Sequence, residues 1–510
     1  MTTLEPSIDS KLAALADAVL IPPFRGTIPP PWILAALARG LAGVTLFGPN
    51  VTGDIASLTA TLRSATGNDP VIAVDEEGGD VTRMGYAQGS AYPGNAALGA
   101  VDDVALTRDV YAAIGADLIQ LGINVDLAPC ADVLAADGTL VIGTRSFGTD
   151  PALVARHVAA AVRGLQGAGV AACAKHFPGH GSTAADSHRT LATISGTLAE
   201  IRVRDLPPFR AAVAAGTWTL MPGHLRVPEL TGDLPATLSP AAITGLLRGE
   251  LGYDGVVICD ALEMKAASAV YGIPEAAVLA ISAGVDLLCL GRDTDEAMYL
   301  AVRVALADAV TTGRLPAARL EEAAGRVAGL RARLGEARRD YVAPAGASHD
   351  GIGVAAARRA LRVCGPVPAR LDNPLVIEVE PEENIAAGRF TWGFSPWTTV
   401  RRVDPGAGDG AMADVLVSEA AGRPLVLAVR NALGVLPLVS DMLTARPDTI
   451  IVEMGVPAWT PPEGTAYLAT YGASRACAEA AAEALGLALS RYPGGHQPPG
   501  PTPRRGRRRR

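Results

Sequence analysis

The stretch AACAKHFPGHGSTAADSH, Ala171–His188, contains the arrangement that decides the fold. It begins with an apolar run of strand length and passes directly into charged side chains, a Pro-Gly break and a loop rich in Ser, Thr and Ala. A continuously apolar run is typical of a parallel strand that is covered on both faces. Polar groups placed directly after such a strand are typical of the active-site end of a (β/α)8 barrel.

Seven further apolar runs share this layout, and the segments between them are long enough for crossover helices. The eight predicted strands are Val19–Ile21, Val44–Phe47, Val71–Val74, Asn124–Leu127, Ala171–Lys175, Trp218–Met221, Val256–Cys259 and Asp286–Leu290. Eight such β/α units predict an α/β fold of the TIM type, with functional side chains at the carboxyl ends of the strands.

The chain divides into a large and a small part. We expect a TIM-type barrel over residues 1–335, a linker over 336–350, a smaller α/β sandwich over 351–493 and a disordered tail rich in Pro, Gly and Arg over 494–510. The linker is predicted from a polar stretch that contains Gly and Pro. The strands predicted for the second domain are Leu375–Val379, Leu425–Val429, Ile450–Met454 and Ala466–Thr470.

The composition excludes several classes of protein. Hydrophobic residues make up 49% of the 510 residues and occur in short blocks, which argues against a membrane protein and against a disordered one. The net charge is −8, and six arginines lie within the last seven residues, so the rest of the chain is still more acidic. We therefore do not expect nucleic acid or a membrane as a partner, although the basic tail leaves a second interaction open.

The cysteines and the N-terminal sequence indicate the cellular compartment. The six cysteines form no C-x-x-C pair and mostly lie in apolar runs, which predicts reduced, buried thiols. The first residues lack the basic region and the long apolar run of a secretory signal. We expect a cytoplasmic protein.

Histidines cluster after the fifth predicted strand. His176, His180 and His188 lie in the stretch quoted above, and Asp186 precedes His188 by two residues. A carboxylate at that spacing can orient an imidazole and raise its basicity, which gives a proton donor and acceptor near neutral pH. Two other interpretations remain open: His180 as an ordinary core residue, and a metal cluster formed by His176, His180 and His224.

Carboxylates follow two other predicted strands. Asp260 ends the run GVVICD, where it can serve as a nucleophile or stabilise developing positive charge, or can simply cap the helix that follows. Asp75, Glu76 and Glu77 precede two glycines. We expect one of these three acids to bind sugar hydroxyls and the other two to cap a turn or face solvent.

Seven motifs in this order resemble those of glycoside hydrolase family 3, and specifically its bacterial β-N-acetylhexosaminidase branch of the two-domain type. They are DEEGGDVTR (Asp75–Arg83), GINVDLAPCADV (Gly122–Val133), VIGTRSFG (Val141–Gly148), KHFPGHGSTAADSH (Lys175–His188), MPGH (Met221–His224), PATLS (Pro235–Ser239) and GVVICDALEM (Gly255–Met264). The resemblance covers the barrel in detail and the second domain only by its length and layout.

The resemblance implies a retaining glycosidase that releases terminal β-linked N-acetylhexosamine from glycosides or cell-wall fragments, as in peptidoglycan recycling, without a metal or another cofactor. Asp260 matches the nucleophile of the family, His188 its acid/base and Asp186 the partner of that histidine. The positions that match the sugar-binding residues are Asp75, Arg83, Arg145, Lys175, His176 and His224. The motifs depart from the family pattern at MPGH and around Cys259, where the fit to the 2-acetamido group could differ.

Several alternatives remain open within and beyond this resemblance. A β-N-acetylglucosaminide phosphorylase and a β-glucosidase belong to the same family. The more remote alternatives are a metal-dependent barrel hydrolase and a sugar-binding protein without turnover.

Overall fold

The eight predicted barrel strands all form, and each one pairs in parallel with at least one other barrel strand. The computed structural model describes residues 9–135, 141–183, 190–194, 196–342, 351–380, 386–388, 392–404 and 411–487. The barrel strands are β1 Leu20–Ile21, β2 Gly43–Thr45, β3 Val71–Val74, β4 Val125–Asp126, β5 Ala171–Phe177, β7 Thr219–Pro222, β9 Val256–Val257 and β10 Leu288–Cys289.

The strands close into a ring. Six of them form one sheet in the order β2-β3-β4-β5-β7-β9, and β1 pairs with β10. Backbone hydrogen bonds join the two sheets, because the Leu287 N–H donates to the Val257 carbonyl at 3.0 Å and the Thr45 N–H donates to the Pro22 carbonyl at 3.3 Å. The predicted TIM-type barrel is confirmed. A small parallel pair, β6 Ala192–Thr193 and β8 Leu225–Arg226, lies outside the ring.

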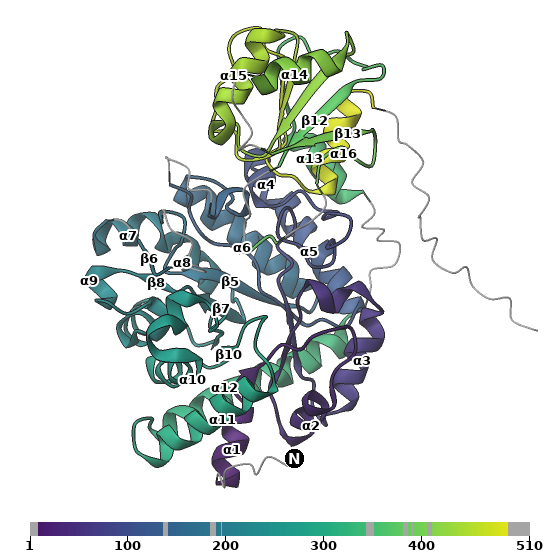
Figure 1. Ribbon diagram of the computed structural model, residues 1–510. Helices are drawn as coiled ribbons and strands as arrows, with labels where there is room; N and C mark the ends of the chain where they lie inside the picture. The colour runs from purple at the N-terminus through teal and green to yellow at the C-terminus, as the bar shows by residue number, and fades with distance from the viewer. Residues whose placement is uncertain are drawn as a thin grey trace, which may run out of the picture.

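Helices surround the barrel and connect its strands (Figure 1). They are α1 Ser10–Asp17, α2 Pro31–Arg39, α3 Ile55–Ser64, α4 Asn95–Val101, α5 Val104–Gln120, α6 Pro151–Gly167, α7 Leu198–Arg204, α8 Leu206–Ala214, the short α9 Pro228–Thr231, a π-helix over Ala241–Glu250, α10 Lys265–Ala283, α11 Glu296–Thr311 and α12 Ala317–Asp340. Local sequence fixes several of their ends: Asp103 and Asp150 accept hydrogen bonds from the first turns of α5 and α6, and Gly40 ends α2 in the left-handed conformation.

Among the described residues, α10 alone is long and apolar enough to cross a membrane by length and composition. Its backbone leaves the helical conformation at Gly272, two residues before Pro274. The part after this break contributes Ala276, Ala280 and Ile281 to the barrel core. We therefore interpret α10 as a barrel helix.

The domain boundary differs from the predicted one. The linker was expected to begin at residue 336, but α12 continues to Asp340. Leu330 and Leu334 pack into the barrel core and hold the last turns of this helix against the barrel, so its Arg-rich end stays helical. The rest of the predicted linker, over residues 343–350, and the predicted tail lie outside the described residues.

The second domain is an α/β sandwich with a six-stranded sheet in the order β11-β16-β15-β14-β12-β13. Its elements are α13 Ile352–Ala360, β11 Arg362–Cys364, β12 Leu375–Val379, β13 Val400–Val403, α14 Ala411–Ala420, β14 Leu425–Val429, α15 Leu436–Ala445, β15 Ile450–Glu453, β16 Tyr467–Ala469 and α16 Arg475–Ala484. The four predicted strands are confirmed. The two edge strands, β11 and β13, were not predicted, because their exposed arginines break the apolar pattern.

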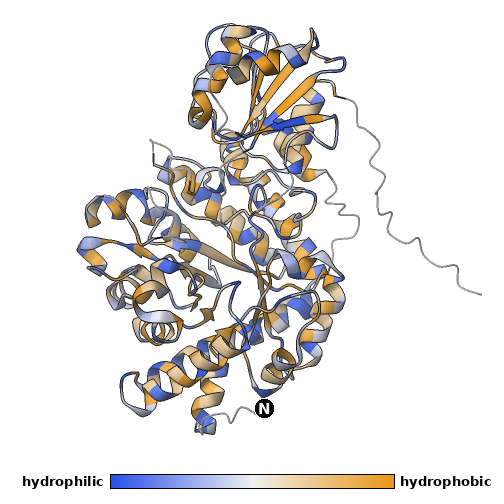
Figure 2. Cartoon of the chain, viewed as in Figure 1, coloured by the Kyte–Doolittle hydropathy of each residue, from blue (hydrophilic) through white to orange (hydrophobic). Residues whose placement is uncertain are grey.

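Alternate residues of the central strands pack on opposite faces of this sheet. Val376 and Val426 contact one core, to which α16 contributes, whereas Ile377 and Leu427 contact the other, to which α14 and α15 contribute. Figure 2 shows the apolar residues along these strands. The domain sits on the barrel at α4, against which α13 packs (Figure 1).

Candidate active site

A lysine joins the carboxyl ends of two barrel strands. Lys175 is near the end of β5 and is 2% exposed. Its Nζ donates to Asp75 Oδ1, directly after β3, at 2.8 Å, and it forms an ion pair with Glu77 Oε1 at 2.8 Å. Although burial acts in the opposite direction, the two carboxylates raise the pKa of Lys175 above its usual value. Lys175 therefore stays charged beside the two acids.

Arg145 and Glu77 form a bidentate pair next to this lysine. Arg145 Nε lies 2.8 Å from one oxygen of Glu77, and Arg145 Nη2 lies 2.7 Å from the other. Burial opposes ionisation of Glu77, but the charges of Arg145 and Lys175 hold the pKa of that carboxyl well below its usual value. Our prediction that two of the three acids cap a turn or face solvent is wrong for Glu77, which is a buried counterion of two cations.

Glu76 organises the loop that follows β3. Its Oε2 accepts hydrogen bonds from the Thr82 hydroxyl and from the backbone N–H groups of Arg83 and Met84, at 2.8–2.9 Å. Burial raises the pKa of Glu76 to about 7. Glu76 thus fulfils the expected role of capping a turn, but the carboxyl is 2% exposed and does not face solvent.

Arg83 lies at the end of the same loop. Its Nη2 is 3.6 Å from Asp75 Oδ2, and its side chain is 11% exposed. The charges of Lys175 and Arg83 outweigh the effect of burial, so the pKa of Asp75 is lowered. The predicted sugar-binding residues Asp75, Arg83, Arg145 and Lys175 therefore form one connected network of charges.

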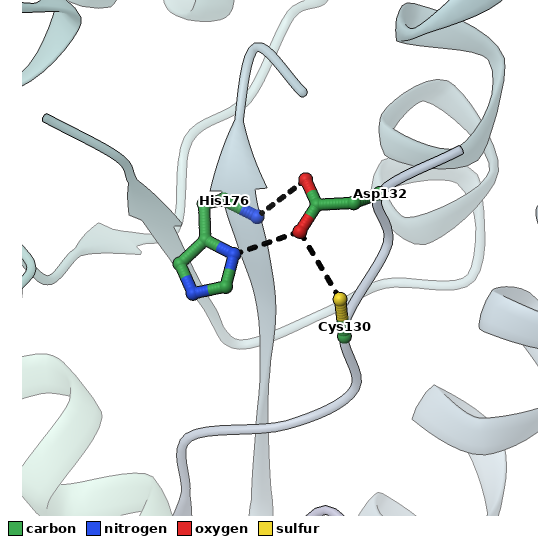
Figure 3. A group of neighbouring side chains, drawn as sticks. All are labelled: Cys130, Asp132 and His176. Atoms are coloured by element: carbon green, nitrogen blue, oxygen red, sulfur yellow. Dashed lines mark hydrogen bonds and ion pairs between the residues drawn. The ribbon is translucent and has the colours of Figure 1, made fainter. Parts of the chain in front are cut away.

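Asp132 orients His176 from the loop after β4 (Figure 3). One carboxylate oxygen accepts from His176 Nδ1 at 2.8 Å and from the Cys130 thiol at 3.1 Å, and the other accepts from the backbone N–H of His180 at 2.7 Å. Because the carboxylate accepts, Nδ1 carries a proton, and Nε2 on the other side of the ring lies 3.4 Å from Arg145 Nη2. His176 thereby joins the network described above.

The positions of the side-chain atoms that could bind a metal ion test the alternative of a metal site. In the described part of the chain, the atoms close enough to share an ion belong to Cys130, Asp132 and His176, all within 4.8 Å of one another (Figure 3). Burial and the charge of Asp132 raise the pKa of Cys130, which keeps this thiol protonated, and the Arg145 guanidinium adds positive charge beside the ring. Both features favour a hydrogen-bonded network over a cation site.

His180 matches the interpretation as a core residue. Its ring is buried, its Nδ1 lies 2.5 Å from the Thr183 hydroxyl, and it meets His176 edge to face. Burial and the neighbouring His176 lower the pKa of His180 to about 4, so this imidazole is neutral at neutral pH.

Asp260 follows β9 and does not cap a helix. Helix α10 begins five residues later, with Met264 at the N-cap position, so the capping alternative is wrong. One oxygen of Asp260 accepts from the backbone N–H of Ala261 at 2.8 Å, and the residue is half-buried. Asp260 follows β9 and Asp75 follows β3, and these strands run parallel in one sheet of the barrel. Asp260 thus lies at the same end of the barrel as the sugar-binding candidates.

His224, predicted to bind sugar, has both ring nitrogens in hydrogen bonds with protein groups. Nε2 donates to the Ala261 carbonyl, and Nδ1 lies 3.0 Å from the Thr237 hydroxyl. The imidazole is fully buried. This position is consistent with support for the backbone beside Asp260. Among the described residues, the ligand atoms close enough to share an ion include His176 but neither His180 nor His224, so the metal cluster of three histidines does not form.

The predicted dyad, Asp186 and His188, lies outside the described residues. The base of its loop is described: Arg204 Nη2 donates to the Ser182 hydroxyl at 2.8 Å and pairs with the buried Asp205. The dyad therefore stays a prediction from the sequence.

Two residues of the site, Asp132 and Thr237, were not among the predicted ones, and Glu77 was predicted only as one of three adjacent acids. All three lie inside the quoted motifs. Each supports a predicted residue, because Glu77 holds Arg145, Asp132 holds His176 and Thr237 holds His224. Their position within the motifs was the signal that could have identified them. The sequence could not show which residues they contact, because the contacting residues are far apart in the chain.

A comparison with protein-family models matches residues 36–330 to the glycosyl hydrolase family 3 N-terminal domain. The chain belongs to glycosyl hydrolase family 3. It is similar to the beta-hexosaminidase A of Pseudoalteromonas piscicida, with 34% identity over 333 residues that cover 60% of this chain and 56% of that relative. It thus spans little more than half the length of that relative. It is also similar to a beta-hexosaminidase of Stenotrophomonas maltophilia, with 37% identity over 51% of this chain and 79% of the relative.

A solved structure resembles both domains of this family 3 chain. It is a glycoside hydrolase family 3 beta-N-acetylglucosaminidase from Paenibacillus sp., with 30% identity and a TM-score of 0.80. The match covers 96% of this chain and 98% of that one. The likeness therefore extends to the C-terminal domain, whose sequence alone carried no recognisable motif. As a member of this family, the chain is a glycosidase.

Proposed function

We propose that this family 3 glycosidase releases terminal β-linked N-acetylglucosamine by a retaining double displacement. The observation that carries the proposal is the network of Asp75, Lys175, Glu77 and Arg145 at one end of the barrel, with Asp260 after β9 at the same end. The names of the relatives support the choice of sugar.

The network suits a polyhydroxylated ring. Charged donors on Lys175, Arg83 and Arg145 and acceptor oxygens on Asp75 can exchange hydrogen bonds with sugar hydroxyls. The groups are already held by one another, so little reorganisation is needed when the sugar binds. Asp132 keeps His176 with Nδ1 protonated, so that its Nε2 is oriented toward Arg145.

In this mechanism the Asp260 carboxylate attacks the anomeric carbon, the glycosidic bond breaks, and a glycosyl ester forms. His188 would protonate the leaving oxygen, and Asp186 would orient and tune that imidazole. In the second step His188 accepts a proton from water as the water attacks the ester and restores Asp260. The anion of Asp260 also stabilises the oxocarbenium-like transition state.

We extend the proposal to the substrate and compartment. Cell-wall fragments of the muropeptide type are the natural substrate we favour, with peptidoglycan recycling as the role. A cytoplasmic location is supported by six free cysteines, five of them buried. Release of N-acetylglucosamine from a purified N-acetylglucosaminyl disaccharide fragment of cell wall would support this substrate, and fractionation of the producing cells would test the location.

The function is tested by comparing p-nitrophenyl β-N-acetylglucosaminide with the corresponding β-glucoside, each with and without phosphate. We expect turnover of the first substrate, free N-acetylglucosamine as the product and no requirement for phosphate. A sugar phosphate as the product would instead identify a phosphorylase, and preference for the glucoside a β-glucosidase. If neither substrate is turned over by folded protein, the proposed function is wrong.

A further inference from the structure

One nitrogen of Arg83 joins the two domains at the candidate sugar-binding site. Arg83 Nη2 lies 3.6 Å from Asp75 Oδ2 in the barrel and donates to the Ala386 carbonyl of the C-terminal domain at 3.1 Å. The guanidinium is therefore held from both sides. Because a free arginine side chain has many rotamers, an anchor of this kind reduces the entropy lost when Arg83 binds a ligand.

Asp80, in the loop after β3, makes a second junction of the same kind. Its Oδ2 accepts from the Thr144 hydroxyl at 2.9 Å and from Arg430 Nη2 of the C-terminal domain at 2.5 Å, and its Oδ1 accepts from the Ala473 N–H at 2.9 Å. The Asp80 carboxylate is 5% exposed. Thr144 immediately precedes Arg145 in the chain. The segment that carries Arg145 is thus tied through Asp80 to the second domain.

Further contacts fix the same part of the barrel. The Ala476 N–H donates to the Ser90 carbonyl at 3.3 Å, and the Cys477 thiol donates to the Pro93 carbonyl at 3.5 Å. Gly353 packs so tightly against Ala91 that a Cβ at Gly353 would overlap the Ala91 carbonyl. The C-terminal domain therefore contacts the loop after β3 along much of its length.

We propose that the C-terminal domain is a positioning element of the sugar-binding site, and that Arg430 is its principal positioning residue. Arg430 fixes Asp80, and Asp80 in turn fixes the loop that ends at Arg83 and the segment that carries Arg145. Loss of the Arg430 charge would leave the Asp80 carboxylate buried without its cation, so the loop would have to rearrange to solvate it. This inference rests on the proposed function, because it concerns the binding of the sugar by that site.

The test compares two arginines that both cross the domain interface. In Arg430→Gln the junction at Asp80 is weakened, whereas in the matched control Arg359→Gln the lost partner is Asp103, an exposed pair 2.9 Å apart that touches none of the sugar-binding residues. We expect Arg430→Gln to raise KM for p-nitrophenyl β-N-acetylglucosaminide, and the Kd for N-acetylglucosamine in calorimetry, by about tenfold. We expect Arg430→Lys to recover part of this loss and Arg359→Gln to stay within twofold of the wild type.

Circular dichroism and the thermal midpoint establish that each variant is folded, and an Asp80→Asn variant, alone and with Arg430→Gln, measures whether the two residues act together. Unchanged KM and Kd in a folded Arg430→Gln protein would overturn the inference, as would equal losses in Arg359→Gln. An inactive wild type that also fails to bind N-acetylglucosamine would instead count against the proposed function.

Discussion

His224 Nε2 donates a hydrogen bond to the carbonyl oxygen of Ala261 at 3.0 Å, and Ala261 is the residue that directly follows the candidate nucleophile Asp260. The imidazole is fully buried and is held on its other side by Thr237. Its contacts thus lie with the backbone beside Asp260.

We expect His224→Ala to lower kcat by about tenfold or more with a smaller change in KM, because the backbone beside Asp260 loses its support. Steady-state kinetics and thermal unfolding measure the two effects. Thr237→Val should change kcat in the same direction but less, since it leaves the bond to Ala261 in place. A rise in KM alone would return His224 to the sugar-binding residues.

Asp260→Asn should abolish turnover and leave the fold intact. The amide has the size of the carboxylate and can still accept from the Ala261 N–H, but it cannot form the glycosyl ester. We expect kcat to fall by roughly 10³-fold or more. Steady-state kinetics check the loss of turnover. Mass spectrometry of protein quenched during turnover checks the covalent intermediate, since only the wild type should carry the added sugar. Near wild-type activity in the folded variant would remove Asp260 from the mechanism.

The dyad predicts a dependence on the leaving group. His188→Ala should severely slow hydrolysis of substrates with poor leaving groups, which need protonation, and should slow glycosylation by activated aryl glycosides less. Azide should partly restore activity, because it attacks the glycosyl ester without a general base. Asp186→Asn should weaken both steps. Equal losses on good and poor leaving groups, without rescue by azide, would contradict this assignment.

Glu77→Gln should destabilise the barrel. Glu77 is buried and is the counterion of Arg145 and Lys175, so its neutralisation leaves excess buried positive charge. We expect the free energy of unfolding to fall by about 3–5 kcal/mol in a urea titration. Glu321→Gln is the control: its pair with Lys11 is exposed to solvent and should contribute little to stability. Similar values for the two variants would show that Glu77 is not a structural counterion.

Glu76 should make stability depend on pH. Burial raises its pKa from an ordinary 4.5 to about 7 in the folded protein, so folding favours the protonated form. The resulting contribution is fully present below about pH 4.5 and is lost as pH rises through 7, at a cost of up to roughly 3 kcal/mol. Glu76→Gln removes this titration. Between pH 5 and 8 the wild type should therefore lose stability relative to the variant, as measured by the free energy of unfolding of each protein. Parallel stability curves would show that Glu76 titrates normally.

Much of the fold follows from local sequence. The runs Val71–Val74, Leu375–Val379 and Leu425–Val429 become β3, β12 and β14 with the predicted bounds, because strands buried on both faces are mostly apolar. The edge strands β11 and β13 were missed, since one side of an edge strand meets solvent and tolerates arginine. The end of α12 was misplaced because polar residues resemble a linker, although the apolar residues among them pack on the barrel.

The sequence by itself determined the eight barrel strands and the candidate residues for the chemistry, since an apolar run and the motif that follows it are local features. Only the tertiary structure decided how those residues are held. Glu77 pairs with Arg145 across 68 positions and Asp80 with Arg430 across 350. Ion pairs and hydrogen bonds depend on distance in space, and a neighbour in the folded chain leaves no local signal in the sequence.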